Sequence, residues 1–164
     1  MVELIYCSIL KSPIGEVVIL ADDTAVYEIT FGKRDTEGLL ENDITKTAKE
    51  QLQAYFDGKL KEFTFKMAQK GTVFQQAVWE ALCTIGYGDT LSYLKFSEQL
   101  QNPLAIRAIA AANGKNNLAI VVPCHRVIGS DGKLVGYAGE LWRKQWLLEH
   151  EKEISGKGQM TLKF

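Results

Sequence analysis

One stretch decides how the fold of this sequence is interpreted, and it is Leu118-Ala119-Ile120-Val121-Val122-Pro123-Cys124-His125-Arg126-Val127-Ile128. Its apolar run over 118–122 predicts a short buried strand. Proline cannot donate to a strand ladder, so Pro123 ends the strand and places Cys124 at its end. Reactive groups are often found on such segments, because a rigid scaffold holds them in position there.

Cys124 differs from the other two cysteines, Cys7 and Cys83, because a histidine and a cation follow it directly. The nucleophilic form of cysteine is the thiolate, which forms more readily beside a base or a positive charge. We therefore predict a reactive thiol at Cys124 and inert, buried thiols at Cys7 and Cys83. The three cysteines have neither a disulfide framework nor zinc-ligand spacing, which favours a reducing compartment and no metal.

The first third of the chain has the pattern of a small antiparallel sheet followed by a helix. Val2–Leu10, Glu16–Leu20 and Thr24–Phe31 are predicted strands separated by turn sequences. A helix should follow and stop at Gly58. Its apolar residues recur at helical spacing, and they are Ile44, Ala48, Leu52 and Tyr55. Residues 1–66 carry no catalytic motif, so we interpret them as a scaffold lobe.

The composition changes near residues 66–71, which we predict to be the boundary between lobes. A second lobe should cover 70–151, followed by a tail over 152–164. Thr72 and Gln75 have the spacing of a capping box that opens its first helix. Ser92–Leu100 and Leu104–Asn113 are predicted helices around a break. This is the outline of a helix-turn-helix, although a generic helical hairpin has the same outline.

The second of these helices carries five alanines, and Arg107 is its only charge. Small side chains fit tight internal packing, or a close approach to a DNA minor groove with Arg107 projecting into the duplex. Residues 1–65 hold seven Lys/Arg and twelve Asp/Glu, whereas residues 104–146 hold six and two. The resulting charges of −5 and +4 permit an anionic partner at the C-terminal half, although ordinary surface charge explains them equally well. No leader or membrane-span pattern is present, so we expect a soluble cytoplasmic protein, or a nuclear one in a eukaryote.

A series of motifs runs through residues 70–151, and they are Gly71-Thr72-Val73-Phe74-Gln75, Val78-Trp79, Ser92-Tyr93, Arg107-Ala108, Asn116, Pro123-Cys124-His125-Arg126-Val127-Ile128, Gly136-Tyr137 and Leu147-Leu148. With these motifs in this order, residues 70–151 closely resemble the O6-alkylguanine-DNA alkyltransferase family, and the N-terminal lobe fits it in general outline. The resemblance implies an α/β (α+β) fold with a ribonuclease H-like N-terminal lobe and a helical C-terminal lobe.

The resemblance also implies the reaction, an irreversible, single-turnover transfer of an alkyl group from O6 of guanine in duplex DNA to Cys124. His125 would act as the base through a water, and Glu151 would orient it. Asn116 would brace the site, and Tyr93 would lie over the flipped base and help guanine to leave. No cofactor is implied, and we expect a monomer.

The remaining roles concern DNA and the substrate pocket. Arg107 would fill the gap that the extruded nucleotide leaves in the duplex. The other residues implied to contact DNA are Tyr93, Ala108, Ala111 and Arg126. The residues implied to line the pocket are Val127, Tyr137, Ala138 and Lys144.

Four positions depart from the family pattern. Glu140 replaces a glycine in the loop expected to close on the substrate, and Ala138 replaces a serine that could contact guanine. Gly86 and Asn117 each replace a proline. These changes leave open which alkyl sizes are accepted and whether alkylated thymine is a substrate. Glu149 also competes with Glu151 as the partner of His125.

Two other classes of protein remain open. A Cys-His hydrolase would need an oriented base and an oxyanion hole for an acyl substrate. A non-catalytic module that binds alkylated DNA would need no acceptor thiol, which the presence of Cys124 disfavours.

Overall fold

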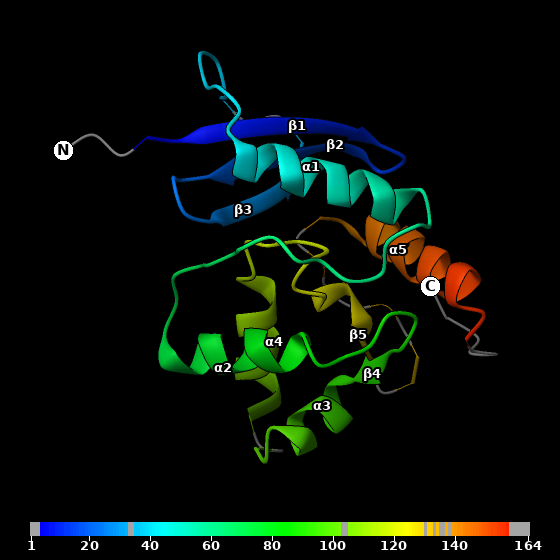
Figure 1. Cartoon of the computed structure of the whole chain (residues 1–164). Helices are drawn as coiled ribbons and strands as arrows, with labels where there is room; N and C mark the ends of the chain where they lie inside the picture. The colour runs from blue at the N-terminus through cyan, green and yellow to red at the C-terminus, as the bar shows by residue number, and fades with distance from the viewer. Residues whose placement is uncertain are drawn as a thin grey trace. The chain divides into compact units, whose positions relative to one another are not determined.

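The computed structural model describes residues 4–32, 35–102, 105–129, 131–132, 134, 137 and 139–157. The chain divides into two compact units, Met1–Gln69 with Asn117–Ala119, and Lys70–Asn116 with Ile120–Phe164 (Figure 1). Within the described ranges, no helix is both long enough and apolar enough to cross a membrane.

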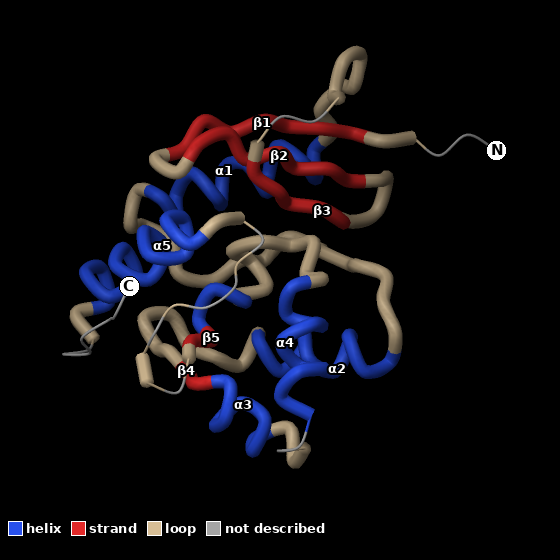
Figure 2. The backbone as a smooth tube through the Cα atoms, turned by 180° about the vertical axis from the view of Figure 1, so that it is seen from behind, coloured by secondary structure: helices blue, strands red, loops and turns tan. Residues whose placement is uncertain are grey.

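The first unit is a three-stranded antiparallel sheet with one helix. Its elements are β1 (Tyr6–Ser12), β2 (Gly15–Ala21), β3 (Val26–Phe31) and α1 (Asp43–Phe56). The strand order is β1-β2-β3 (Figure 2). The register pairs Cys7 with Leu20. Asn42 and Thr45 form a capping box that starts α1. The sheet and helix predicted from the sequence are confirmed, although β1 starts later than predicted and extends to Ser12.

The predicted strand over 118–122 is wrong. Leu118 forms one isolated parallel bridge with Ile29, and the chain then turns. Ile29 donates to Asn117 O at 2.8 Å, and Ala119 donates to Ile29 O at 3.1 Å. Ile120 has a φ of 72°, which breaks the extended backbone. An apolar run predicts burial, and Ile120–Val122 are indeed buried, but it does not by itself supply a neighbouring strand.

The second unit is mostly helical. Its elements are α2 (Val73–Leu82), β4 (Leu91–Ser92), α3 (Tyr93–Gln99), α4 (Ile106–Gly114), η2 (Cys124–Arg126, a 3-10 helix), β5 (Val127–Ile128) and α5 (Leu141–Ser155). The capping box of Thr72 and Gln75 is present, and Ser92 caps α3. The indole of Trp79 on α2 donates to Ala112 O on α4 at 2.9 Å. The three predicted helices are confirmed, with Pro103 and Leu104 outside the described residues.

Two features of this unit were not predicted. β4 and β5 pair in parallel, with Leu91 opposite Val127 and Ser92 opposite Ile128. These two-residue strands are too short to leave a periodic signal in the sequence. In addition, α5 continues to Ser155, so position 152, where we predicted a tail to begin, lies inside the helix.

Candidate active site

Cys124 begins the short helix η2, and every residue from Val121 to Ile128 is buried. The Cys124 side chain belongs to this buried segment, at 6% exposure. Asn116 Nδ2 donates to Val122 O at 2.9 Å, which fixes the backbone just before the cysteine. Burial raises the pKa of the Cys124 thiol, while a hydrogen bond from Asn116 and the positive charge of Lys144 oppose the rise. The thiol therefore depends on its neighbours to become a thiolate.

His125 pairs with Glu151 in the interior of this unit. Their Nε2 and Oε2 atoms lie 2.7 Å apart, and the two residues are 0% and 1% exposed. Burial lowers the pKa of His125, although Glu151 acts against this. Burial pushes the pKa of Glu151 upward, but His125 and Arg126 outweigh it and hold that pKa well below its usual range. A neutral imidazole beside an ionised carboxylate is a suitable base for a nearby thiol.

The choice between the two candidate carboxylates is decided by their positions on α5. Glu149 is exposed, and its Oε1 accepts a hydrogen bond from Gln145 Nε2 at 3.1 Å. Glu151 faces inward and binds His125. An α-helix turns by about 100° per residue, so positions 149 and 151 cannot share a face.

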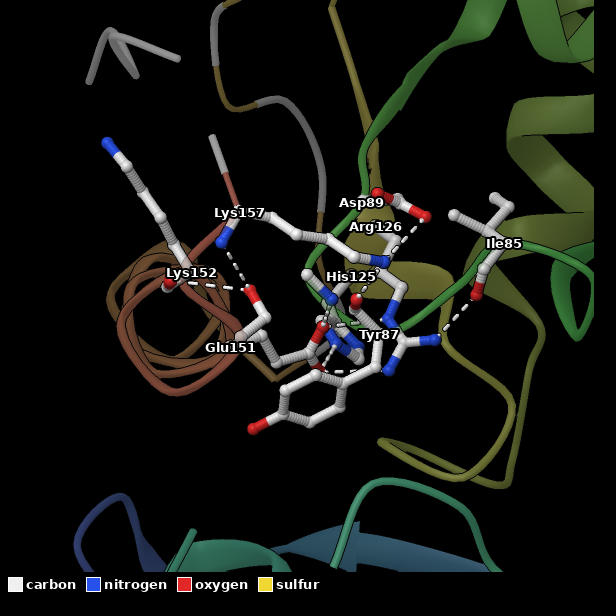
Figure 3. A network of polar contacts seen from close by, with 10 residues as sticks. Ile85, Tyr87, Asp89, His125, Arg126, Glu151, Lys152 and Lys157 are labelled. Carbon is white, nitrogen blue, oxygen red and sulfur yellow. Dashed lines mark hydrogen bonds and ion pairs between the residues drawn. The ribbon is translucent and has the colours of Figure 1, made fainter. Parts of the chain in front are cut away.

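Arg126 is not at the surface. It is 7% exposed, and its Nε donates to Glu151 Oε1 at 2.8 Å. Its Nη1 donates to Ile85 O at 2.6 Å (Figure 3). This placement argues against the predicted DNA contact, because the guanidinium is already engaged inside the unit. From the sequence alone we expected this arginine at the surface, where it could contact DNA. Its burial shows that it binds other residues of the same unit instead.

Tyr93 lies at the start of α3, partly buried, near the cysteine. Burial raises its pKa to about 12, with the negative charge of Cys124 adding to the effect and Asn113 opposing it. Asn113 Nδ2 donates to Tyr93 Oη at 3.0 Å and approaches Cys124 O at 3.5 Å. The tyrosine therefore stays protonated at neutral pH and can act as a hydrogen-bond donor.

Asn113 is a site residue that our sequence interpretation missed. We interpreted it as the last residue of a helix before Gly114. The signal was its position, because Ile109 and Asn113 are four residues apart and share the buried face of α4. A polar amide on a buried helix face needs partners, and here these are Tyr93 and Cys124.

Lys144 is the buried cation of the site. It is 0% exposed, and its Nζ donates to Val127 O at 2.7 Å. Burial lowers its pKa to about 8, while negative charge on Cys124 acts in the opposite direction. The lysine is therefore mostly charged at neutral pH and stabilises a thiolate. The contact also occupies the carbonyl of Val127, a predicted pocket residue.

Tyr137 is the other predicted pocket residue that the structure describes. Burial raises its pKa well above the usual value, and negative charge on Cys124 contributes to this. The predicted pocket residue Ala138 lies outside the described residues. Glu140 follows, with a φ of 76° and a ψ of 147°, a conformation rarely adopted by residues other than glycine.

The predicted DNA-contacting residues of α4 lie on its exposed face. Arg107, Ala108 and Ala111 are exposed, whereas Ile109 and Ala112 are buried. Ala112 is therefore a packing residue, as the first sequence interpretation expected. Ala108 and Ala111 are exposed, as the second interpretation, a close approach to DNA, requires. Tight packing accounts for the inner alanine, and an exposed strip of small side chains remains outside.

The other cysteines differ from each other. Cys7 is buried as predicted, in the sheet of the first unit. Cys83, predicted to be buried, is exposed at the end of α2, so that prediction is wrong. Leu82, the last residue of α2, is buried, and Cys83 follows it as the exposed C-cap. Among the described residues, no group of three or more His, Cys, Asp and Glu side chains is placed to hold a metal ion.

Comparison with known proteins assigns the family. Residues 5–69 match the family described as "6-O-methylguanine DNA methyltransferase, ribonuclease-like domain", and residues 73–153 match its "DNA binding domain". A methylated-DNA–protein-cysteine methyltransferase of Methanosarcina mazei is 43% identical over 153 residues, covering 90% of this chain and 97% of its own. The chain belongs to the methylated-DNA–protein-cysteine methyltransferase family. The family resemblance and the fold class predicted from the sequence are confirmed.

Other members of this methyltransferase family agree. The protein of the same name from Mycobacterium leprae is 44% identical over 154 residues, covering 91% of this chain and 93% of its own. A crystal structure of Mycobacterium tuberculosis O6-methylguanine methyltransferase is 40% identical, has a TM-score of 0.81, and covers 92% of this chain and 94% of that one. A crystal structure of Mycobacterium tuberculosis OGT in complex with DNA is 40% identical with a TM-score of 0.82, covering 91% and 94%.

Proposed function

We propose that this methyltransferase repairs alkylated duplex DNA by moving an alkyl group from O6 of guanine onto its own Cys124, once per molecule. The observation that carries the assignment to Cys124 is its surroundings. The thiol adjoins the buried His125–Glu151 pair, and its ionisation is favoured by the charge of Lys144. Burial raises the pKa of both other thiols; Glu41 adds to the rise at Cys7, and at Cys83 Arg126 opposes the rise while Glu80 adds to it.

The chemistry is an in-line displacement at saturated carbon. The thiol proton passes to His125 through a water, and the sulfur lone pair forms the new S–C bond. The C–O6 bond breaks, and its electron pair stays on the guanine oxygen. Tyr93 stabilises this developing charge by hydrogen bonding, and guanine ends with the one proton that the thiol lost. The thioether has no labile group, so the thiol is not regenerated.

The target oxygen lies within a stacked base pair, so the nucleotide has to leave the duplex, at a cost of about a few kcal/mol. We assign this step to the exposed face of α4, where small side chains allow close approach and Arg107 can occupy the gap. Two observations support the proposal, the exposure of this face and the relative solved with DNA. Position 126 is left out of the DNA contacts because its side chain is buried.

Three finer expectations belong to the same proposal. The protein acts as a monomer, needs no cofactor, and works where the DNA is, in the cytoplasm or in a nucleus. Residues 1–66 serve as a scaffold, and the reactive residues lie between 70 and 151. O4-alkylthymine remains a candidate second substrate, because it presents a similarly activated alkyl group.

Intact-protein mass spectrometry tests the assignment. After mixing with duplex containing O6-methylguanine, we expect one methyl group per chain, located on the Cys124 peptide. Cys124→Ala should bind the same duplex but gain no mass, and Cys83→Ala, which removes the exposed thiol, should react like the parent protein.

Each other result identifies a different class. Methyl transfer to Cys124→Ala would contradict the nucleophile assignment. Binding without any mass gain would indicate the non-catalytic module. Repeated turnover of an activated ester by an unmodified Cys124 would indicate a hydrolase.

A further inference from the structure

The carboxylate of Glu151 is held by four donors inside the second unit. Its Oε1 accepts from Arg126 Nε at 2.8 Å and from Gly88 N at 3.3 Å. Its Oε2 lies 2.7 Å from His125 Nε2 and accepts from Arg126 Nη2 at 3.1 Å (Figure 3). Arg126 thus spans both oxygens, and His125 shares one of them.

The guanidinium of Arg126 is itself anchored away from the carboxylate. Its Nη1 donates to Ile85 O at 2.6 Å, and its Cζ lies 5.7 Å from the centre of the Tyr87 ring. Because the guanidinium is planar and rigid, fixing one edge fixes the direction of the other. The turn after α2 therefore determines, through Arg126, the plane in which the Glu151 carboxylate lies.

We propose that Arg126 is a positioning residue, which holds the Glu151 carboxylate so that Oε2 faces His125 and which takes up part of its negative charge. The inference rests on the proposed transfer to Cys124. It assigns to this arginine a function inside the unit in place of the DNA contact that its sequence position suggested.

The first consequence concerns which nitrogen of His125 acts as the base. An ionised carboxylate can only accept, so the proton of the neutral imidazole lies on Nε2. Nδ1 then carries the lone pair, and it makes no hydrogen bond to a described protein atom. If the carboxylate rotated, the imidazole could turn or change tautomer, and the lone pair would no longer be held in one direction.

The second consequence concerns how basic His125 is. The charged groups that act on it are Glu151, Arg126 and Lys144. Glu151 favours the imidazolium, while Arg126 and Lys144 oppose it. Burial is the largest cause of the lowered pKa of His125, and Arg126 adds to it by neutralising part of the carboxylate charge. A lower pKa keeps the imidazole neutral, and only the neutral form can accept the thiol proton.

Two substitutions separate these effects. Arg126→Lys keeps the charge but loses the two-pronged guanidinium contact, so we expect methyl transfer to slow by roughly tenfold or more while the acid limb of its pH profile stays in place.

Arg126→Met removes the charge, so we expect the pKa of His125, followed by NMR of labelled histidine, to rise by about one unit. The acid limb of the transfer rate should move to higher pH by the same amount.

Lys157→Met is the matched control. Lys157 Nζ donates to Tyr87 O at 3.1 Å and pairs with Asp89 at 3.4 Å, so it belongs to the surrounding network through contacts that do not involve Glu151. This variant should keep the parent rate and pH profile. Urea unfolding of each variant reports the folded fraction, so that lost stability is not mistaken for lost positioning.

The outcomes are decisive in either direction. A folded Arg126→Lys that transfers methyl at the parent rate overturns the proposal, as does an Arg126→Met whose histidine titration is unchanged. Should Arg126→Met not fold, the rate of Arg126→Lys decides alone. Failure of the parent protein to methylate Cys124 would instead contradict the proposed function, while the histidine titration, which needs no DNA, would still test the role of Arg126.

Discussion

The interior around Cys124 and the exposed face of α4 differ in composition and in function, although both belong to one unit. Around the cysteine, charged side chains are buried and each has a named partner, such as Glu151 with Arg126 or Lys144 with Val127. On α4, the outward residues are alanines and a single cation, Arg107. The interior controls the protonation of one sulfur atom, whereas the exposed face controls access to DNA. Substitutions should therefore affect reactivity or binding, but seldom both.

A large effect on thiol reactivity is expected for Lys144→Met, which removes the buried cation. We expect the pKa of Cys124 to rise by about one unit, so that its reaction with iodoacetamide slows about tenfold at neutral pH. Because the pKa of Lys144 is about 8, the ammonium helps below that pH and loses its proton above it. The difference between the two proteins should therefore shrink as the pH rises through 8.

Duplex binding provides the control for that prediction. Lys144 is fully buried, so the variant should bind O6-methylguanine duplex with the parent affinity. A loss of affinity as large as the loss of thiol reactivity would show that interior and surface are not separable.

Arg107→Ala should have the reverse effect. We expect roughly tenfold weaker binding to O6-methylguanine duplex, measured by fluorescence anisotropy, and an unchanged rate of reaction of Cys124 with iodoacetamide. Lys46→Ala, which removes an exposed cation from α1, serves as the control and should leave affinity unchanged. Normal affinity in Arg107→Ala would remove this residue from the proposed DNA contact.

The same contrast explains what could be predicted from the sequence. Capping boxes, turn residues and apolar spacing are local signals, and they identified β1 to β3 and α1 to α4. The pairing of β4 with β5 depends on two residues in each strand, and the positive φ of Ile120 depends on its surroundings. Neither leaves a pattern in the sequence.

Site residues followed a similar rule. Cys124 was predicted from the residues that follow it, and Glu151 was implied by the family resemblance, with Glu149 as an alternative. The burial of Arg126 and the contact between Asn113 and Tyr93 depend on which face of each element is covered. The sequence does not show whether a charged or amide side chain faces solvent or the interior. Its role depends on the residues that contact it in the fold.

The smallest expected effect concerns Glu140, the residue directly before α5. Its carboxylate accepts from Trp142 Nε1 at 2.8 Å, and Arg143 lies 3.8 Å away, but the side chain is 69% exposed. Such exposed contacts contribute less than about 1 kcal/mol. A φ of 76° with a ψ of 147° costs a residue other than glycine about 1–3 kcal/mol, and alanine would keep this cost while glycine would not.

We therefore expect Glu140→Gly to be more stable than Glu140→Ala by about 1 kcal/mol in urea unfolding. Position 149 offers the opposite case on the same helix, since Glu149 is exposed and lies in the helical interior of α5. There, glycine should be less stable than alanine by about 1 kcal/mol. The same order of stability at both positions would contradict the strain at Glu140. Unchanged thiol reactivity in both position-140 variants would show that the backbone strain at Glu140 does not affect the charged residues around Cys124.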